Sequence, residues 1–310
     1  MNNFSDDIIV ILGPTASSKT AFAARLAKEM NGEVISADSR QVYKKMDIGT
    51  GKDYNDYIVD GLAVPYHLID IHEPGYKYNV YEYQKDFLKA YQDIKARNKL
   101  PVLCGGTGMY IEAVLQGYKL IQVPPDEQLR NELHSKSLDE LKQILFSYTD
   151  QLHNTTDLTS KKRAIRAIEI SKYYAEHPQE DMSYPSIKPS VLGVSFDRPA
   201  QRRRITERLR NRLENGMIEE AEFLLKYGLS KEDLMYYGLE YKYLALYLNG
   251  ELNYNQMFEK LNTAIHQFAK RQMTYFRRMQ KNGLKIYWIN GHMSMADKMR
   301  EARNILSKQH

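Results

Sequence analysis

The sequence predicts an α/β protein, with a parallel sheet flanked by helices and a mainly helical insert domain. Short apolar runs alternate with segments of helical periodicity over residues 8–115, and this alternation favours a parallel sheet covered on both faces. A stretch without a strand candidate follows, and another apolar run then resumes the pattern. Polar clusters stand directly after three of the apolar runs, where open parallel sheets bind ligands.

The individual elements follow from the spacing of apolar residues. The predicted strands of the core are the short apolar runs Ile8–Leu12, Glu33–Ala37, Tyr66–Ile71, Pro101–Cys104, Ser190–Phe196 and Lys285–Ile289. The predicted helices of the core have intervals of three and four, at Ala21–Met30, Asn79–Asn98, Met109–Leu115, Pro199–Tyr227, Asn255–Lys281 and Met295–Ser307.

The stretch between these two groups of strands predicts a separate helical unit. It contains polar helical segments at Glu127–Ser135, Leu138–Tyr148 and Leu158–Tyr174, and then a linker rich in proline, serine and charge. We therefore expect an α/β core made of residues 1–121 and 190–310, and a helical insert made of residues 122–189.

Composition excludes several classes of protein. The chain of 310 residues has a formal net charge of +5, no apolar run as long as a membrane span, and a polar, acidic start unlike a signal peptide. Its single cysteine, Cys104, cannot form an internal disulfide and ends an apolar run, which favours a buried structural thiol over a nucleophile. We expect a cytoplasmic monomer with no membrane segment.

The segment Gly13–Thr20, which reads GPTASSKT, predicts a site for a di- or triphosphate. It joins a strand to a helix, so that backbone N–H groups face an anion, Lys19 adds a positive charge, and the Thr20 hydroxyl can hold Mg²⁺. Ser18 stands where the consensus G-x-x-x-x-G-K-[ST] has its second glycine, and its Cβ predicts a strained, weakened loop. An ordinary strand–turn–helix is the alternative interpretation.

Positive charge gathers in three runs. Seven arginines and one acid lie between Arg198 and Arg212, six basic residues and no acid lie between Gln267 and Lys285, and a third cluster lies at residues 161–166. A solvated helix face explains any one run. Three runs beside a phosphate loop, with aromatic residues interleaved, indicate a nucleic acid together with a small phosphorylated ligand.

An ordered set of motifs resembles the tRNA dimethylallyltransferase family from about residue 8 to residue 288. The motifs are GPTASSKT (13–20), SADSRQVY (36–43), DIGTGK (47–52), HLIDI (67–71), GGTGMYI (105–111), RRRITERL (202–209), GMIEEA (216–221), YGLEYK (237–242) and FAKRQMTYFRR (268–278). The resemblance implies a P-loop-type core with a mostly helical insert and Mg²⁺ as the metal. It also implies transfer of a dimethylallyl group from dimethylallyl diphosphate to N6 of adenine 37, beside the anticodon of tRNA.

The resemblance further implies roles for single residues. Asp38 is the base that takes the N6 proton, Thr15 contacts the bridging oxygen of the diphosphate, and Lys19 and Arg208 complete the catalytic set. The diphosphate-binding residues are Gly13, Pro14, Thr15, Ala16, Ser17, Ser18, Lys19 and Thr20, and Thr20 is the metal ligand. The tRNA-binding residues are Asp38, Ser39, Arg40, Gln41, Thr107, Arg163, Arg166, Tyr237, Gly238, Lys270, Arg271, Gln272, Arg277 and Arg278. Arg204 and Arg212 stack with Arg208 at intervals of four, and we expect both to bind tRNA.

Other interpretations remain open at this point. A small-molecule kinase using ATP in the same loop leaves the three basic runs without a role. A non-catalytic tRNA-binding paralogue, or an enzyme acting on free adenine nucleotides, fits the motifs as well. Asp38 has its own alternative as a turn or cap carboxylate, because Asp-Ser is a common helix start. Ser18, Arg40 and the segment 153–160 depart from the family's usual pattern, so a slower enzyme or an altered substrate is consistent with the sequence.

Overall fold

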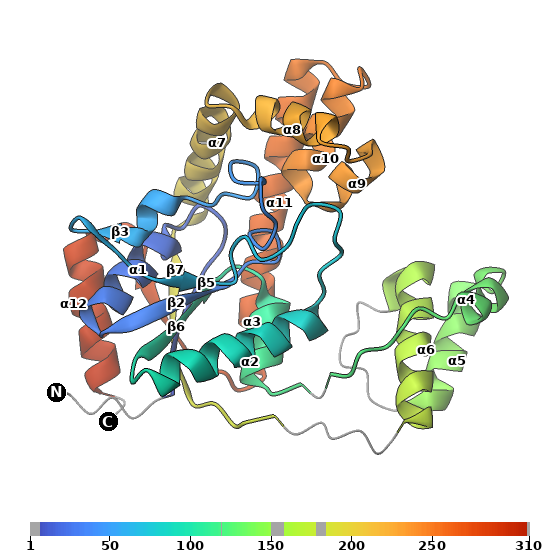
Figure 1. Cartoon of the computed structure of the whole chain (residues 1–310), viewed down its shortest axis with the longest axis horizontal. Helices are drawn as coiled ribbons and strands as arrows, with labels where there is room; N and C mark the ends of the chain where they lie inside the picture. The colour runs from blue at the N-terminus through green and yellow to red at the C-terminus, as the bar shows by residue number, and fades with distance from the viewer. Residues whose placement is uncertain (1–6, 119, 150–157, 178–183, 309–310) are drawn as a thin grey trace. The chain divides into compact units, whose positions relative to one another are not determined.

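The protein consists of two compact units, Met1–Gly117 with Pro185–His310, and Tyr118–Tyr184. A computed structural model describes residues 7–118, 120–149, 158–177 and 184–308 (Figure 1). Within these ranges no helix combines the length and the apolar character that a membrane span requires.

A six-stranded parallel sheet forms the centre of the larger unit. Its strands are β1 (Ile8–Leu12), β2 (Gly32–Ala37), β5 (Tyr66–His67), β6 (Leu100–Gly105), β7 (Pro189–Ser195) and β8 (Ile286–Asn290). They lie in the order β5-β2-β6-β1-β7-β8, and all five neighbouring pairs are parallel. The predicted fold class is therefore confirmed. Because β2, β6 and β1 are neighbours, the three polar clusters that follow them meet at one edge.

Helices cover both faces of this sheet. Helices α1 (Lys19–Glu29) and α12 (Met295–Ser307) bury Phe22, Leu26 and Met299 against alternate residues of the strands. Helix α2 (Val80–Ala96) contacts β2 and β6 but contributes no residue to the apolar cluster that α1 and α12 form with the strands, so α2 covers the opposite face. Helix α3 (Gly108–Leu115) packs beside α2. A 3₁₀ turn (Tyr54–Tyr57) and a small hairpin of β3 (Ile58–Val59) and β4 (Leu62–Ala63) lie beside α1.

A group of five helices extends beyond the sheet (Figure 1). They are α7 (Arg198–Glu214), α8 (Met217–Lys226), α9 (Lys231–Tyr236), α10 (Leu239–Leu248) and the long α11 (Tyr254–Lys281). The single helix predicted at Pro199–Tyr227 is wrong. Its chain breaks at Gly216, whose φ of 102° ends one helix and starts the next, a conformation that glycine adopts at little cost.

The strand predicted at Tyr66–Ile71 is too long. Pairing with β2 ends at His67 because Leu68 and Asp70 adopt left-handed φ values of 62° and 56°. The turn points the Asp70 carboxylate at the buried ammonium of Lys52, with Oδ1 2.5 Å from Nζ. A buried lysine needs such a partner, and this requirement overrides the strand pattern.

Among its described residues, the smaller unit contains helices and no strand. Its helices α4 (Glu127–His134), α5 (Leu138–Tyr148) and α6 (Lys161–Glu176) bury Leu133, Leu141 and Ile168 in a core of their own. Ser137 caps α5 through a reciprocal pair of hydrogen bonds with Glu140. The divergent segment 153–160 and the expected linker lie partly outside the described residues.

Candidate functional site

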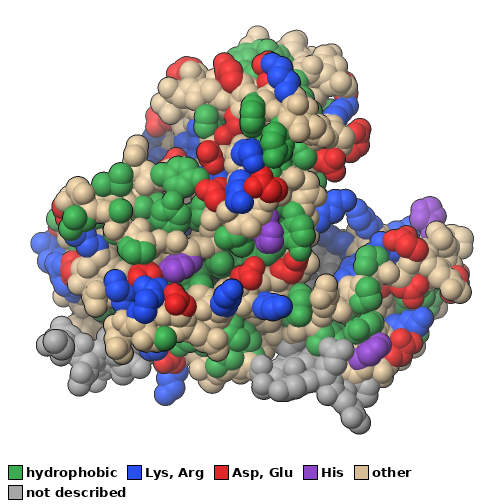
Figure 2. All heavy atoms as spheres, in the orientation of Figure 1, with side chains coloured by type: hydrophobic (Ala, Val, Ile, Leu, Met, Phe, Trp, Pro, Cys, Tyr) green, Lys and Arg blue, Asp and Glu red, His purple; other side chains and the backbone are tan. Residues whose placement is uncertain are grey.

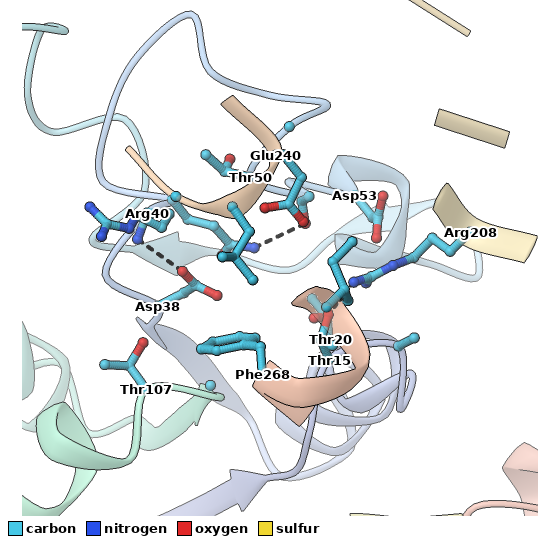
Figure 3. A pocket seen from close by; sticks show the side chains of 18 of the residues that line it. Thr15, Thr20, Asp38, Arg40, Thr50, Asp53, Thr107, Arg208, Glu240 and Phe268 are labelled. Carbon is cyan, nitrogen blue, oxygen red and sulfur yellow. Dashed lines mark hydrogen bonds between the residues drawn. The ribbon is translucent and has the colours of Figure 1, made fainter. Parts of the chain in front are cut away.

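A pocket of about 830 Å³ opens at the carboxyl ends of β1, β2 and β6. It is lined by the phosphate loop, the turn at Asp38–Gln41, Thr107 and side chains of α7, α10 and α11 (Figure 3). Three of the motifs seen in the sequence therefore contribute to one site. Four of the helices beyond the sheet, α7, α9, α10 and α11, supply the rest of the lining.

The phosphate loop has a constrained backbone. Ala16 and Ser18 both adopt left-handed φ values, 60° and 57°, where a side chain costs about 1 kcal/mol or more. The Ser18 hydroxyl accepts a hydrogen bond from Arg204 Nη2 at 2.6 Å, and Arg204 Nε donates to the Ala16 carbonyl at 2.9 Å. The strain expected at Ser18 is present, and Arg204 holds the strained segment in place.

A glutamine from α11 fixes the other side of this loop. The Thr15 N–H donates to Gln272 Oε1 at 2.8 Å, while Gln272 Nε2 donates to the Gly106 carbonyl at 2.9 Å. The side chain is 7% exposed, and both of its amide groups are used inside the protein. Gln272, expected to contact tRNA, therefore ties the phosphate loop to the loop after β6.

Two cations face the interior of the pocket from the loop and from α7. Burial lowers the pKa of the Lys19 ammonium, which donates to the Pro14 carbonyl at 3.4 Å. Burial and, next, the neighbouring Arg212 lower the pKa of Arg208, whose Nη2 donates to the Thr15 hydroxyl. A guanidinium stays protonated in proteins. Both groups are thus desolvated cations that a bound anion would stabilise.

Asp38 stands directly after β2 and faces the pocket (Figure 3). Its Oδ1 accepts the Arg40 N–H at 2.9 Å, and this hydrogen bond closes a turn. The Ser39 N–H, next in the chain, donates to Thr107 Oγ1 at 3.1 Å. Among the described residues, no group donates to Asp38 Oδ2. The carboxylate thus has one oxygen that orders the turn and another that is available to a ligand.

Acidic side chains occupy the same pocket. Asp56 lies beside Asp53, and burial followed by that neighbouring charge raises the pKa of Asp56 to about 6. Burial also raises the pKa of Glu240, at the start of α10.

Mg²⁺ usually takes one or two carboxylates, substrate phosphates and water. The Thr20 hydroxyl with Asp53 and Asp56 fits that donor set. No cluster of three His, Cys, Asp or Glu residues that could hold a metal by itself occurs in the described parts of the chain.

One wall of the pocket is apolar. Met235, Leu239, Ile265 and Phe268 line it, and the Phe268 ring lies near Asp38 in the close view (Figure 3). Cys104 also reaches the pocket lining, but burial raises the pKa of its thiol to about 12, which supports its interpretation as a structural residue.

The other residues expected to contact tRNA differ in their burial and in their contacts with the rest of the protein. Gln41 bridges Ser36 and the Gly51 carbonyl, Tyr237 is buried, and Arg278 pairs with Glu112 at 2.6 Å.

Arg40 lies over the Tyr236 ring at 5.2 Å, and Gly238 and Arg271 also line the pocket. Lys270 and Arg277 are exposed on α11 outside the lining. In the smaller unit, Arg163 is exposed, whereas Arg166 pairs with the buried Glu169 at 3.0 Å.

Basic side chains do not form one continuous patch on the face shown in Figure 2, where lysine and arginine alternate with aspartate and glutamate. Several site residues were missed in the sequence because no local pattern marks them: Asp53, Asp56, Glu240, Ile265 and Phe268. They become neighbours only through tertiary folding, although Glu240 and Phe268 fall inside recognised motifs.

These features define a class: a P-loop-type α/β protein with a cation-lined pocket for a phosphorylated ligand. A family profile described as "IPP transferase" matches residues 41–279, and another described as "Isopentenyl transferase" matches residues 6–62. The chain belongs to the IPP transferase family. The resemblance inferred from the motifs is thereby confirmed.

Curated relatives cover nearly the whole chain. The tRNA dimethylallyltransferase 2 of Bacteroides fragilis is 57% identical over 293 residues, which span 94% of this chain and 95% of that protein. The tRNA dimethylallyltransferase 1 of Parabacteroides distasonis is 54% identical over 305 residues, which span 98% and 99%.

Solved structures show the same fold. The tRNA isopentenylpyrophosphate transferase of Bacillus halodurans is similar with a TM-score of 0.70 and 31% identity, covering 98% of this chain and 96% of that one. A eukaryotic dimethylallyltransferase acting on tRNA has a TM-score of 0.75 at 22% identity, covering 96% of this chain and 77% of that one. At that identity the likeness concerns the fold alone.

Proposed function

We propose that this protein transfers a dimethylallyl group from dimethylallyl diphosphate to N6 of adenine 37, next to the anticodon of tRNA, and releases diphosphate. The observation that carries the proposal is one pocket that holds a phosphate loop, a carboxylate with an oxygen to which no described residue donates, and apolar side chains. Those three parts match the diphosphate, the attacking amine and the prenyl group. The family membership and the names of the relatives support the same reaction.

The pocket suits the bond changes of this reaction. The N6 nitrogen forms a bond to C1 of the dimethylallyl group, the C1–O bond breaks, and the diphosphate leaves with the electron pair. Asp38 Oδ2 takes the proton from N6, which an exocyclic amine must lose to become a neutral product. Meanwhile Lys19, Arg208 and the backbone N–H groups of the loop stabilise the charge that grows on the diphosphate.

The bound metal would add to this charge stabilisation. Thr20, with Asp53 or Asp56, would hold Mg²⁺ beside the phosphates, and the ion would neutralise part of their charge. A tRNA loop base must leave its stack to reach such a pocket, which anticodon loop bases do readily. We propose a cytoplasmic enzyme that acts as a monomer.

The test is incubation of the purified protein with dimethylallyl diphosphate, Mg²⁺ and unmodified tRNA, followed by nucleoside analysis. We expect dimethylallyl-adenosine at position 37 and one diphosphate released per group transferred. A tRNA with guanosine at position 37 is the matched control and should give no product. Binding of tRNA without product, or phosphate transfer from ATP instead, would contradict the proposal.

A further inference from the structure

Arg212 is a buried cation whose Nη2 has no hydrogen-bond partner among the described residues. It lies on α7 one turn beyond Arg208 and lines the same pocket. The residue is 8% exposed, and its Nη2 is enclosed without a hydrogen-bond partner. Asp53 Oδ2 lies 3.5 Å from Nη2 and makes an ion pair but no hydrogen bond. Within the described part of the chain, no side-chain N–H of Arg212 donates to any group.

Such a group is costly for a folded protein. Burying a cation removes its hydration, and only partners of good geometry repay that loss. The two arginines that precede it on the same face do have partners, since Arg204 contacts Ser18 and Arg208 contacts Thr15. Among these three arginines, Arg212 is therefore the one whose side chain lacks a hydrogen-bond partner in the described residues.

The neighbouring backbone is shaped around this guanidinium. Gly51 adopts a φ of 73°, and a Cβ there would lie 2.3 Å from Arg212 Nη2. Any other residue at that point would push the guanidinium out of place. The guanidinium thus fills the space beside Gly51, and its fork of N–H donors matches two oxygens of a phosphoryl group.

We propose that Arg212 is a second arginine that binds the diphosphate group, on oxygens that the phosphate loop and Arg208 leave free. This inference rests on the proposed transfer reaction. When the C1–O bond breaks and its electron pair stays with the diphosphate, the added charge falls partly on oxygens facing Arg212, which remains protonated throughout. The sequence had assigned Arg212 to tRNA.

Two sources could supply a phosphoryl group, namely the leaving diphosphate and the RNA backbone. The position of Arg212 favours diphosphate. Arg208 touches the phosphate loop, and Arg212 follows it by about 6 Å along the same helix, within the span of one small ligand. The guanidinium is also enclosed by the protein, whereas an RNA backbone would lie at the pocket mouth.

The test compares Arg212→Met and Arg212→Lys with Arg210→Met, a change on the same helix at an exposed side chain. Calorimetric titration with inorganic diphosphate, at fixed Mg²⁺ and without tRNA, measures the affinity. We expect Arg212→Met to weaken binding by about 10- to 100-fold, the range for losing a charged hydrogen bond, and Arg210→Met to leave it unchanged. Arg212→Lys should fall between them, because it keeps the charge but loses the fork.

A second readout separates binding from structure. Since the Arg212 side chain donates no hydrogen bond to any described residue, Arg212→Met should leave the melting temperature of the free protein unchanged or raise it. A lower melting temperature with diphosphate affinity within twofold of the wild type would overturn the proposal. Unchanged diphosphate affinity with a shallower salt dependence of tRNA binding would overturn it as well, and would assign Arg212 to the RNA backbone. Product formation by the wild type tests the transfer reaction separately.

Discussion

At the scale of single residues, Asp38 combines a structural and a chemical task on its two oxygens. Its Oδ1 accepts the Arg40 N–H, as a turn carboxylate does, while Oδ2 has no donor among the described residues. The two interpretations that the sequence left open are therefore compatible. An asparagine side chain at this position can still accept the Arg40 N–H, but it cannot take a proton from a substrate.

This division predicts the behaviour of Asp38→Asn. Turnover with saturating diphosphate and tRNA should fall by about two to four orders of magnitude, the range for removing a general base. Binding of both substrates and the melting temperature should hardly change, because the asparagine oxygen still accepts the Arg40 N–H. Near-normal turnover would remove Asp38 from the mechanism.

Asp70→Asn is the matched control for that experiment. Asp70 also follows the sheet edge, but its carboxylate pairs with the buried Lys52. We expect this change to lower stability by about 1 to 3 kcal/mol, because it weakens the partner of a buried charge, and to affect turnover much less. The two aspartates should thus show opposite patterns in thermal unfolding and in rate assays.

Ser18 offers a second prediction at this scale. Ser18→Gly relieves a left-handed φ worth about 1 kcal/mol but loses the hydrogen bond to Arg204, so stability should change by less than about 1 kcal/mol. Ser18→Ala keeps the strain and loses the bond, and it should be the less stable of the two in chemical denaturation. A weakened site also predicts tighter diphosphate binding and faster turnover in Ser18→Gly. Equal stability of both variants would mean that the loop is not strained at this position.

At the scale of elements, a carboxylate on α8 holds the segment between β2 and the 3₁₀ turn. Glu220 accepts the N–H groups of Asp47, Ile48 and Gly49 at 2.7, 2.8 and 2.8 Å, and the Tyr241 hydroxyl at 2.7 Å. That segment continues into the pocket lining at Thr50 and Asp53. Glu220 therefore connects the helices beyond the sheet to the wall of the site.

Replacing this carboxylate should affect both stability and substrate binding. Glu220→Gln keeps a single acceptor oxygen for four donors, so we expect a loss of about 2 kcal/mol or more in the free energy of unfolding. The KM for dimethylallyl diphosphate should rise more than kcat falls, because Asp53 and Thr50 lose their support. Glu219→Gln, at the exposed neighbouring position, should change neither. Similar small effects from both variants would contradict this role.

At the scale of the whole molecule, the sequence was most informative where structure is local. The core strands other than the end of β5, the phosphate loop and the position of Asp38 after β2 followed from short patterns, because a buried parallel strand and the turn after it depend on few neighbours. Contacts between distant elements could not be predicted in the same way. Gln272 was assigned to RNA but reaches Thr15 across 257 positions. Arg212 on α7 lies beside Gly51, which is distant from it in the sequence. The break at Gly216 escaped notice because charged and apolar residues continue the helical pattern on both sides.

The smaller unit supplies the last prediction. It has its own apolar core around Leu141 and Ile168, and the exposed side chains of Lys161, Lys162 and Arg163 begin its α6. The pocket lining contains no residue of this unit among those described. We therefore propose that the unit binds tRNA and leaves the diphosphate site alone.

Exchanging those three basic residues for glutamine should lower tRNA affinity and reduce the slope of log affinity against log salt by about 2 to 3, at roughly 0.7 to 0.9 for each lost phosphate contact. Diphosphate affinity, measured by titration, should stay unchanged. Arg300→Gln on α12, an exposed arginine outside the pocket, serves as the control and should leave the slope as it is. Replacing residues 118–184 with a flexible linker should lower tRNA affinity further and should also leave diphosphate affinity unchanged. Loss of diphosphate binding in that shortened protein, with the larger unit still folded by circular dichroism, would show that the unit helps to build the pocket.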